Sequence, residues 1–319
     1  MAFTTLSYTK IMMIMMILVL IMLENTYVKT QRIVPAVFVF GDSIVDVGNN
    51  NNLPTLIKSN FPPYGRDFAN HKSTGRFSNG KLAIDYLVDA LNFESYPQAY
   101  LSTHGSSNEL LIGANFASAA SGYDDSTANL YFSISLSKQL QYFGEYQSRI
   151  VGMVGQANAS SIFSGGLYIN LHSMGARRVG VASLGPLGCL PGAITLFGVG
   201  NNNQCVDRLN YDAIYFNRRL NSTSQLLRNR LPDLNLLVLD IYQPLYNLIN
   251  NPIENGFYET RKGCCGLGIV ETSILCNSLS IGTCSNASDH IFWDAFHPSQ
   301  AANHLLSTYM IGAGYSLVT

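Results

Sequence analysis

Short, unbroken apolar runs alternate in this chain with longer segments whose apolar residues recur at helical spacing. The runs are Ala36–Phe40, Leu110–Phe116, Leu167–Ile169, Val179–Ser183 and Leu234–Leu239. Strands that are apolar on both faces are typical of parallel sheets. The helical segments are Leu82–Leu91, a stripe from Leu136 to Val154, Val206–Leu231 and Ala301–Ile311. This alternation predicts an α/β domain in three layers, with helices on both faces of a mostly parallel sheet.

One connection is too short for this pattern. Only the seven residues Leu171–Arg177 are left to join the strand Leu167–Ile169 to the strand Val179–Ser183. A parallel crossover normally takes about a dozen residues or more and usually includes a helix. Either these two strands are not parallel neighbours, or one crossover helix is missing.

The N-terminus has the composition of a secretory leader. Lys10 is the only charge in the first ten residues, and Ile11–Leu23 is an apolar run of 13 residues. Such a run is too short to span a bilayer as a helix but suits a signal-peptide core. We predict a signal peptide over residues 1–30, cleaved between Glu24 and Gln31, and one domain over residues 31–319. The alternative is a short membrane anchor.

Six cysteines fit an exported protein. An even number in an oxidising compartment suggests up to three disulfides, and the sequence leaves the pairing open. The competing interpretation is a metal site, but no Cys-x-x-Cys occurs and no histidine has ligand spacing to a cysteine. Glycosylation sequons begin at Asn158, Asn221 and Asn286. Together with the leader they favour a secreted, extracellular glycoprotein without a stable membrane span.

The charge balance argues against a nucleic-acid partner. Lys and Arg total 19 against 20 Asp and Glu, and no basic block or stripe occurs. Charged residues make up 12% of the chain, which is compatible with an apolar substrate. The sequence does not indicate an oligomeric state.

A candidate nucleophile follows the first buried strand directly. Ser43 lies in Gly-Asp-Ser at the carboxyl end of that strand, where open α/β sheets collect their ligands. A serine hydroxyl needs a base within hydrogen-bond reach. Asp294 and His297, three residues apart near the other end of the chain, suit a turn in which the carboxylate orients the imidazole. Each piece alone also fits an ordinary turn.

Longer motifs strengthen that interpretation. Residues 41–51 (GDSIVDVGNNN) resemble the first sequence block of the plant GDSL esterase/lipase family, a branch of the SGNH hydrolases. The resemblance continues through residues 74–80 (TGRFSNG), 113–118 (GANFAS), 185–189 (GPLGC) and 292–298 (FWDAFHP). It covers nearly all of the chain after the leader and implies a flavodoxin-like SGNH-hydrolase sheet.

The resemblance implies a role for each matching position. Ser43 would be the nucleophile, His297 the general base and then acid, and Asp294 its orienting partner. The oxyanion hole would use the backbone N–H of Ser43, a backbone N–H at Ala120 and an Asn side chain from the third block. No metal or nucleotide cofactor is implied, and the absence of a Gly-x-Ser-x-Gly elbow argues against the α/β-hydrolase type of lipase.

Two positions depart from the family pattern. The position of Ala120 is usually glycine, and alanine tolerates positive φ poorly, which makes the aim of this N–H uncertain. The third block is not found, because Asn170 leads almost directly into residues that resemble the far end of its helix. We interpret this, with the short connection, as an internal deletion near residues 170–173 that arose by splicing or in the gene model. Asn170 could replace the lost donor, but its position several residues early should aim it elsewhere.

The sequence therefore predicts a secreted serine esterase or lipase acting on a lipid or small-molecule ester. Activity could be impaired by loss of an oxyanion donor, and transfer of the acyl group to an alcohol is an open alternative to hydrolysis. A second hypothesis is a catalytically weak or inactive secreted protein that binds lipid or cell-wall material. A third is that the chain does not fold stably, because a sheet without one crossover exposes strand edges.

Overall fold

The computed structural model describes residues 31–102, 108–169, 176–198 and 204–318, together with Met12, Met13, Met15 and Met16. The chain divides into two units, Met1–Arg32 and Ile33–Thr319, and everything below concerns the second. The predicted leader lies almost entirely outside the described residues, and its role stays a prediction. No helix in the described ranges has both the length and the apolar character that crossing a membrane requires.

Five parallel strands form the central sheet in the order β2-β1-β3-β4-β5. Their bounds are β1 Val37–Val39, β2 Gly113–Asn115, β3 Leu167–Ile169, β4 Arg178–Ala182 and β5 Asn235–Leu239. This order is the flavodoxin-like one, in which the sequence of strands reverses beside β1. Each strand overlaps one of the predicted apolar runs. The predicted α/β fold with a mostly parallel sheet is therefore confirmed.

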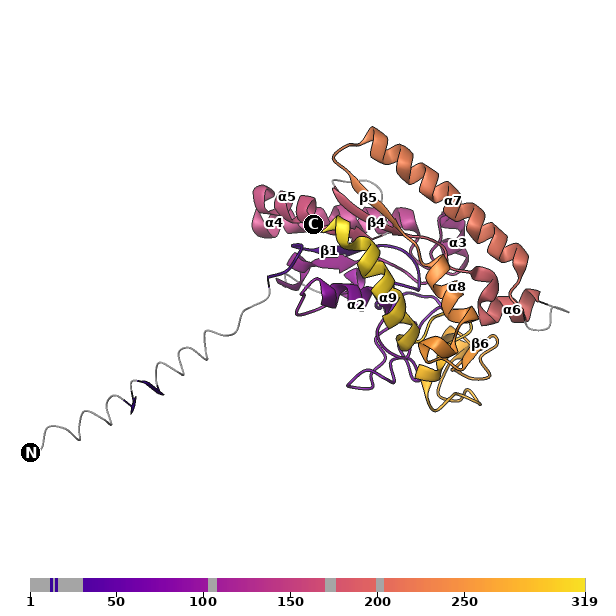
Figure 1. Ribbon diagram of the computed structural model, residues 1–319. Coiled ribbons are helices and arrows are strands. Elements are labelled where there is room, and N and C mark those ends of the chain that lie inside the picture. Colours follow the sequence, from indigo (N-terminus) through magenta and orange to yellow (C-terminus); the bar gives the residue numbers. More distant parts are fainter. Residues whose placement is uncertain are drawn as a thin grey trace, which may run out of the picture. The chain divides into compact units, whose positions relative to one another are not determined.

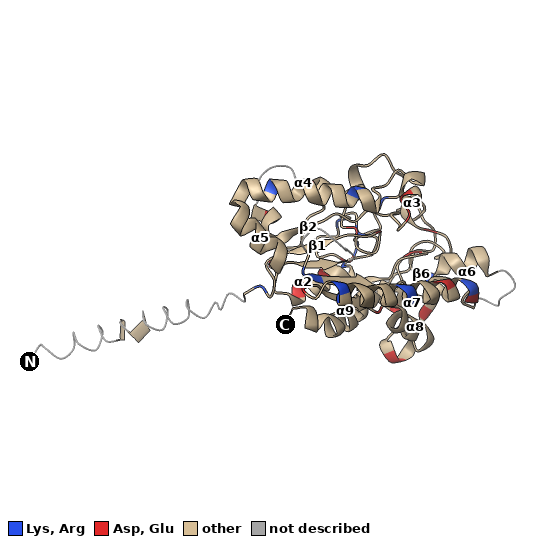
Figure 2. Cartoon of the chain, turned by 90° about the horizontal axis from the view of Figure 1, so that it is seen from above, with Lys and Arg blue, Asp and Glu red and all other residues tan. Residues whose placement is uncertain are grey.

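The sheet is apolar on both faces, as its sequence pattern predicts. Successive strand residues point to opposite faces, so Phe38 and Tyr168 join one core cluster while Val37 and Ile169 join another. The first cluster packs against α4 and α5, the second against α2, and Figures 1 and 2 show the sheet between these layers. These helices are α2 Ala83–Ala90, α4 Leu136–Val154 and α5 Gln156–Gly165.

The remaining helices are α3 Asp125–Leu130, α6 Pro191–Phe197, α7 Asp207–Arg230, α8 Tyr242–Asn250 and α9 Gln300–Gly314. Leu220 and Leu227 of α7 pack against the first cluster and Ile311 of α9 against the second, so these two helices lie over opposite faces of the sheet. A second, two-stranded sheet pairs β6 Glu259–Gly263 with β7 His290–Phe292 in parallel. Lys and Arg are spread along α4 and α7 rather than gathered in one group (Figure 2).

The connection between β3 and β4 decides one of the alternatives left open above. β3 and β4 are parallel neighbours, with Leu167 opposite Arg178 and Ile169 opposite Gly180. The idea that they do not pair is therefore wrong. Eight residues, 170–177, join them, and residues 170–175 lie outside the described ranges. A chain of this length is below what a parallel crossover normally takes.

All six cysteines lie in pairs at disulfide distance. The pairs are Cys189–Cys205, Cys264–Cys284 and Cys265–Cys276. The last two of these pairs cross-link the segment between β6 and β7, which has little regular structure. That segment carries residues that contact the site described next.

Candidate active site

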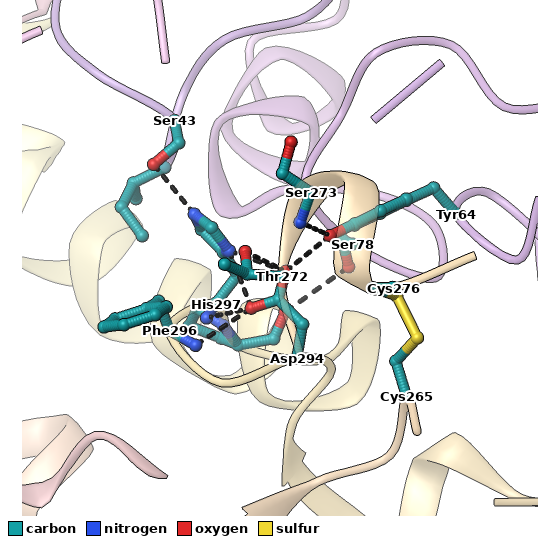
Figure 3. A network of polar contacts seen from close by, with 12 residues as sticks. Ser43, Tyr64, Ser78, Cys265, Thr272, Ser273, Cys276, Asp294, Phe296 and His297 are labelled. Carbon is teal, nitrogen blue, oxygen red and sulfur yellow. Dashed lines mark hydrogen bonds and ion pairs between the residues drawn. A yellow bond between two sulfur atoms is a disulfide. The ribbon is translucent and has the colours of Figure 1, made fainter. Parts of the chain in front are cut away.

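Ser43 lies in a tight turn directly after β1. Gly41, two residues earlier, has φ of 138°, a backbone conformation that residues with a Cβ rarely adopt. The Asp42 carbonyl then accepts hydrogen bonds from the N–H groups of Val45 (3.3 Å) and Asp46 (3.0 Å). This closed turn leaves the Ser43 side chain at the carboxyl end of the sheet, directed at an imidazole ring (Figure 3).

That imidazole belongs to a second turn, which follows β7. The Asp294 carboxylate oxygen Oδ1 accepts the backbone N–H groups of Phe296 and His297, each at 2.9 Å. Trp293 N–H donates to the His297 carbonyl (2.7 Å), which closes the turn from the other side. The three-residue spacing between carboxylate and imidazole thus produces the local geometry that it suggests. Ser299 then caps α9 by accepting the Ala302 N–H.

The three predicted residues form one hydrogen-bonded chain. Nδ1 of His297 lies 2.7 Å from Oδ1 of Asp294 and 2.9 Å from Oδ2, and Nε2 lies 2.8 Å from Oγ of Ser43. An ionised carboxylate only accepts hydrogen bonds, so Nδ1 carries the proton and Nε2 is left to accept one from the serine. Residues 254 positions apart in sequence are therefore placed for proton transfer.

Asp294 is kept ionised although it is fully buried. Burial by itself would raise the pKa of its carboxyl group, but attraction to His297 and the hydrogen bonds that it accepts outweigh this and hold the pKa below its ordinary value. The donors include the His297 ring, the Phe296 N–H and the Tyr64 hydroxyl. A negative charge at this place stabilises an imidazolium that forms beside it.

The backbone around Ala120 adopts the conformation that its alanine disfavours. Ala120 has φ of 64°, in the left-handed region. Its segment is fixed beside the Ser43 turn, because Ser118 N–H donates to the Gly41 carbonyl (3.0 Å). Among the described residues, the backbone N–H groups of Ser43 and Ala120 have no acceptor. Both donors are therefore free, and their role in an oxyanion hole stays a prediction. Asn170, the suggested substitute for a third donor, lies outside the described residues.

Polar residues after Ser43 form hydrogen bonds beyond their own loop. The loop hydrogen bonds are present, since Asp46 Oδ1 accepts the N–H groups of Gly48 and Asn49. However, Asp46 Oδ2 also accepts the N–H of Ala119, at 3.0 Å. Asn49 and Asn50 donate to carbonyls of the same 115–119 segment. These side chains connect the Ser43 turn to the segment that carries Ala120, a connection that the sequence pattern did not reveal.

Gln139 makes the same connection from the opposite side. Its side chain is fully buried and pairs with both backbone groups of Gly41, accepting the N–H and donating to the carbonyl, each at 2.9 Å. It also donates to Oγ of Ser121 (3.1 Å). Gln139 lies on the same face of α4 as the core residues Phe143 and Tyr146. A polar residue on a buried helical face needs hydrogen-bond partners. The position of Gln139 on this apolar face is therefore the sequence signal that could have revealed it.

Comparison with known proteins identifies the family. The family model described as GDSL-like Lipase/Acylhydrolase matches residues 37–166 and 157–310. GDSL esterase/lipase At5g03820 of Arabidopsis thaliana is 50% identical over 91% of this chain and 93% of its own length. GDSL esterase/lipase At3g53100 is 48% identical over 94% of this chain and 97% of its own length, and GDSL esterase/lipase APG is 49% identical over 90% and 93%. The chain belongs to the GDSL esterase/lipase family. It is therefore a member of a family of ester hydrolases.

One of these alignments is longer than the part of the chain that it covers. The alignment with At5g03820 spans 330 positions, but 91% of the 319 residues is only about 290. About 40 positions of that relative therefore have no counterpart here. The family match also divides into two parts, one ending at residue 166 and the other beginning at residue 157. The two parts overlap over residues 157–166, and the second continues through β3, the short connection and β4.

An apolar cavity of about 400 Å³ opens beside Ser43 and His297. Its wall comes from the carboxyl ends of β3 and β4 and from α2, α8 and α9. Polar side chains in this wall are engaged with the protein, because Ser183 donates to Asp240 and Asn303 donates to the Pro298 carbonyl. In the described residues no group of three or more His, Cys, Asp or Glu side chains is arranged to hold a metal ion.

Proposed function

We propose that this GDSL esterase/lipase hydrolyses carboxylic esters through an acyl-enzyme on Ser43. The observation that supports this most directly is the unbroken chain of hydrogen bonds from Ser43 through His297 to the buried Asp294. The adjoining cavity is mostly apolar, which favours a lipid or small-molecule ester as substrate over a charged one.

In the proposed mechanism His297 moves the proton twice. Nε2 takes the hydroxyl proton as Ser43 Oγ attacks the ester carbonyl carbon, and the carbonyl π electrons move to its oxygen. The N–H groups of Ser43 and Ala120 donate to that oxyanion. The tetrahedral intermediate then expels the alcohol, which leaves with the proton from Nε2. Water repeats the sequence, releasing the acid and restoring Ser43. Asp294 stays ionised throughout.

We propose further that the chain lacks the third oxyanion donor through an internal deletion near residues 170–173. Two observations support it: the eight-residue link between parallel neighbours, and about 40 alignment positions of At5g03820 that have no counterpart in this chain. Loss of one oxyanion donor typically costs about 10²–10³ in kcat. The chain is therefore proposed to be a slower esterase than its intact relatives.

We also propose that the protein is secreted and glycosylated. The asparagines of all three sequons are exposed, on α5, α7 and the loop before β7. The paired cysteines suit an oxidising compartment. Expression of the full-length chain in plant cells should deliver it to the medium, with a mass that falls on enzymatic removal of N-glycans. Retention inside the cell at the mass of the unprocessed chain would contradict this proposal.

Ester hydrolysis by the wild type and by Ser43→Ala tests the proposed function. We expect slow hydrolysis of p-nitrophenyl acetate by the wild type and loss of that activity in the variant. Equal rates for the two purified proteins would end the proposal. The competing function, a secreted binder without catalysis, predicts no reaction of Ser43 with a fluorophosphonate, whereas the esterase predicts labelling.

A further inference from the structure

The cavity beside Ser43 extends away from the catalytic turn toward α9. Its apolar wall contains Ala83, Ile84, Ile169, Ala182, Leu306 and Met310. Ala83 and Ile84 come from the first turn of α2, and Leu306 and Met310 from one face of α9. Because these side chains offer no hydrogen-bonding groups, the part of a ligand that lies among them must be hydrocarbon. An alkyl chain that begins at the ester carbonyl satisfies this requirement.

The volume sets the length of that chain. A cavity of about 150 Å³ holds one benzene molecule, so about 400 Å³ accommodates on the order of ten carbon atoms once the ester group is included. We propose that this cavity binds the acyl chain of the substrate and selects unbranched acyl groups of roughly eight to twelve carbons. This inference rests on the proposed Ser43 mechanism.

A chain-length series of p-nitrophenyl esters tests the acyl pocket. From butanoate to octanoate, kcat/KM should rise by up to about fourfold for each methylene group that the wall buries, and it should level off when the cavity is full. Ala182→Leu, which narrows the cavity, should lower the ratio of decanoate to butanoate hydrolysis at least tenfold. Leu279→Ala, a change at an exposed residue outside the wall, should keep the wild-type ratio.

The outcomes separate the pocket from the proposed function. The acyl pocket would be overturned, and the esterase left intact, by either of two results. One is hydrolysis of the acetate ester with no rise of kcat/KM along the series; the other is a wild-type ratio of decanoate to butanoate hydrolysis in folded Ala182→Leu. If Ala182→Leu shows no cooperative unfolding, Leu306→Ala replaces it and should move the best chain to a longer one. No hydrolysis of any ester would instead overturn the proposed function.

A second inference concerns Oδ2 of Asp294, which accepts hydrogen bonds from outside the turn. The His297 ring lies within 2.9 Å of both carboxylate oxygens, and Oδ1 also accepts two backbone N–H groups. Oδ2 instead accepts the hydroxyl of Tyr64 at 2.8 Å and that of Thr272 at 3.0 Å (Figure 3). Tyr64 is 230 residues away in sequence, in the loop between β1 and α2. Thr272 lies in the loop closed by the Cys265–Cys276 disulfide.

Tyr64 is oriented so that its hydroxyl donates a hydrogen bond to Asp294. Its hydroxyl accepts the backbone N–H of Ser273 (2.8 Å), which leaves the O–H to donate to the carboxylate. Burial, and then the charge of Asp294, raise the pKa of Tyr64 well above its ordinary value, so it remains a donor. The ring is 1% exposed and packs edge-on against Phe77 and Trp293.

We propose that Tyr64 and Thr272 are positioning residues that fix the orientation and charge of Asp294. Asp294 in turn sets the imidazole against Ser43. Removing either donor should leave substrate binding intact. The Asp294 carboxylate is then able to rotate and, with one hydrogen-bond donor fewer, attracts the Nδ1 proton of His297 more strongly. This effect reaches the reaction only through His297, so it appears in kcat and in pH dependence rather than in KM.

Tyr64→Phe compared with Tyr146→Phe tests this role. Both changes delete one buried hydroxyl that donates a hydrogen bond, but Tyr146 donates to the Leu110 carbonyl in the core, outside the site. We expect Tyr64→Phe to lower kcat about tenfold at constant KM and to move the acidic limb of the kcat/KM profile to higher pH. Tyr146→Phe should do neither, even if both variants lose similar stability.

The conservative changes at Thr272 complete the test. Thr272→Ser keeps a hydroxyl and should retain most of the activity, whereas Thr272→Val, of nearly the same shape, should behave like a milder Tyr64→Phe. Wild-type kcat and an unmoved acidic limb in Tyr64→Phe would show that the hydroxyl serves folding alone. If Tyr64→Phe does not fold, the Thr272 pair decides, and equal activity of its two members would overturn the proposal. An inactive wild type would reject the proposed function rather than this role.

Discussion

Replacing Gln139 should lower the stability of the fold and disturb the Ser43 turn. The change Gln139→Met keeps the length of the side chain but removes both partners of Gly41, whose N–H and carbonyl each pair with the glutamine at 2.9 Å. A backbone group that loses its partner away from water costs about 1–3 kcal/mol. Gly41 is only partly buried, so we expect the two groups together to lower the free energy of unfolding by about 2–4 kcal/mol.

The measurement is urea unfolding followed by fluorescence of Trp293, the only tryptophan, which is fully buried. The matched control is Gln141→Met, two residues further along α4, where the glutamine is exposed and a substitution should stay within about 0.5 kcal/mol. Because Gln139 also donates a hydrogen bond to Ser121, kcat of Gln139→Met should be lower than that of the wild type at urea concentrations that leave both proteins folded. Equal unfolding free energies for the two variants would refute the reasoning.

Three further predictions concern residues around the site. Ala120→Gly should raise the melting temperature or leave it unchanged and should not lower kcat, because glycine relieves a left-handed φ of 64° that costs alanine about 1–2 kcal/mol; a clear loss of activity would contradict a strained donor. Burial raises the pKa of Asp46 to about 6. Ionisation of Asp46 as the pH rises from about 4 to about 6 should therefore lower the free energy of unfolding of the wild type, relative to Asp46→Asn, by about 2–3 kcal/mol. Parallel curves of unfolding free energy against pH for the two proteins would exclude this. Replacing Cys265 and Cys276 together by alanine should lower the free energy of unfolding by roughly 3 kcal/mol and should lower kcat, because Thr272 lies in the loop that this disulfide closes. A wild-type kcat in this variant would show that the loop keeps its shape without the disulfide.

The central sheet could be predicted from the sequence because its strands are buried on both faces. Runs such as Ala36–Phe40 and Leu234–Leu239 leave no polar face, and α4 and α7 show long helical stripes. The strand β6, Glu-Thr-Arg-Lys-Gly, could not be found this way. It is largely charged and pairs with β7 at the edge of the molecule, where tertiary contacts override composition.

The site was predicted only in its local parts and in those that the family resemblance supplied. Spacing alone indicates that Asp294 can orient His297, since the two lie in one turn. The approach of Ser43 to His297 joins the end of β1 in the central sheet to the turn after β7 in the second sheet, and no spacing in the sequence encodes how these two parts pack. Tyr64 gave no signal, because its contact with Asp294 joins two loops and depends on how the disulfide-closed segment folds over the site.

The most direct test of the account is detection of the acyl-enzyme itself. Brief incubation with p-nitrophenyl butanoate, quenching in acid and mass spectrometry of the digested protein should show a butanoyl group on the peptide that contains Ser43. The adduct should be absent in Ser43→Ala and greatly reduced in His297→Ala. A folded wild-type protein that releases p-nitrophenol while Ser43 stays unmodified, or that carries the acyl group elsewhere, would contradict the mechanism.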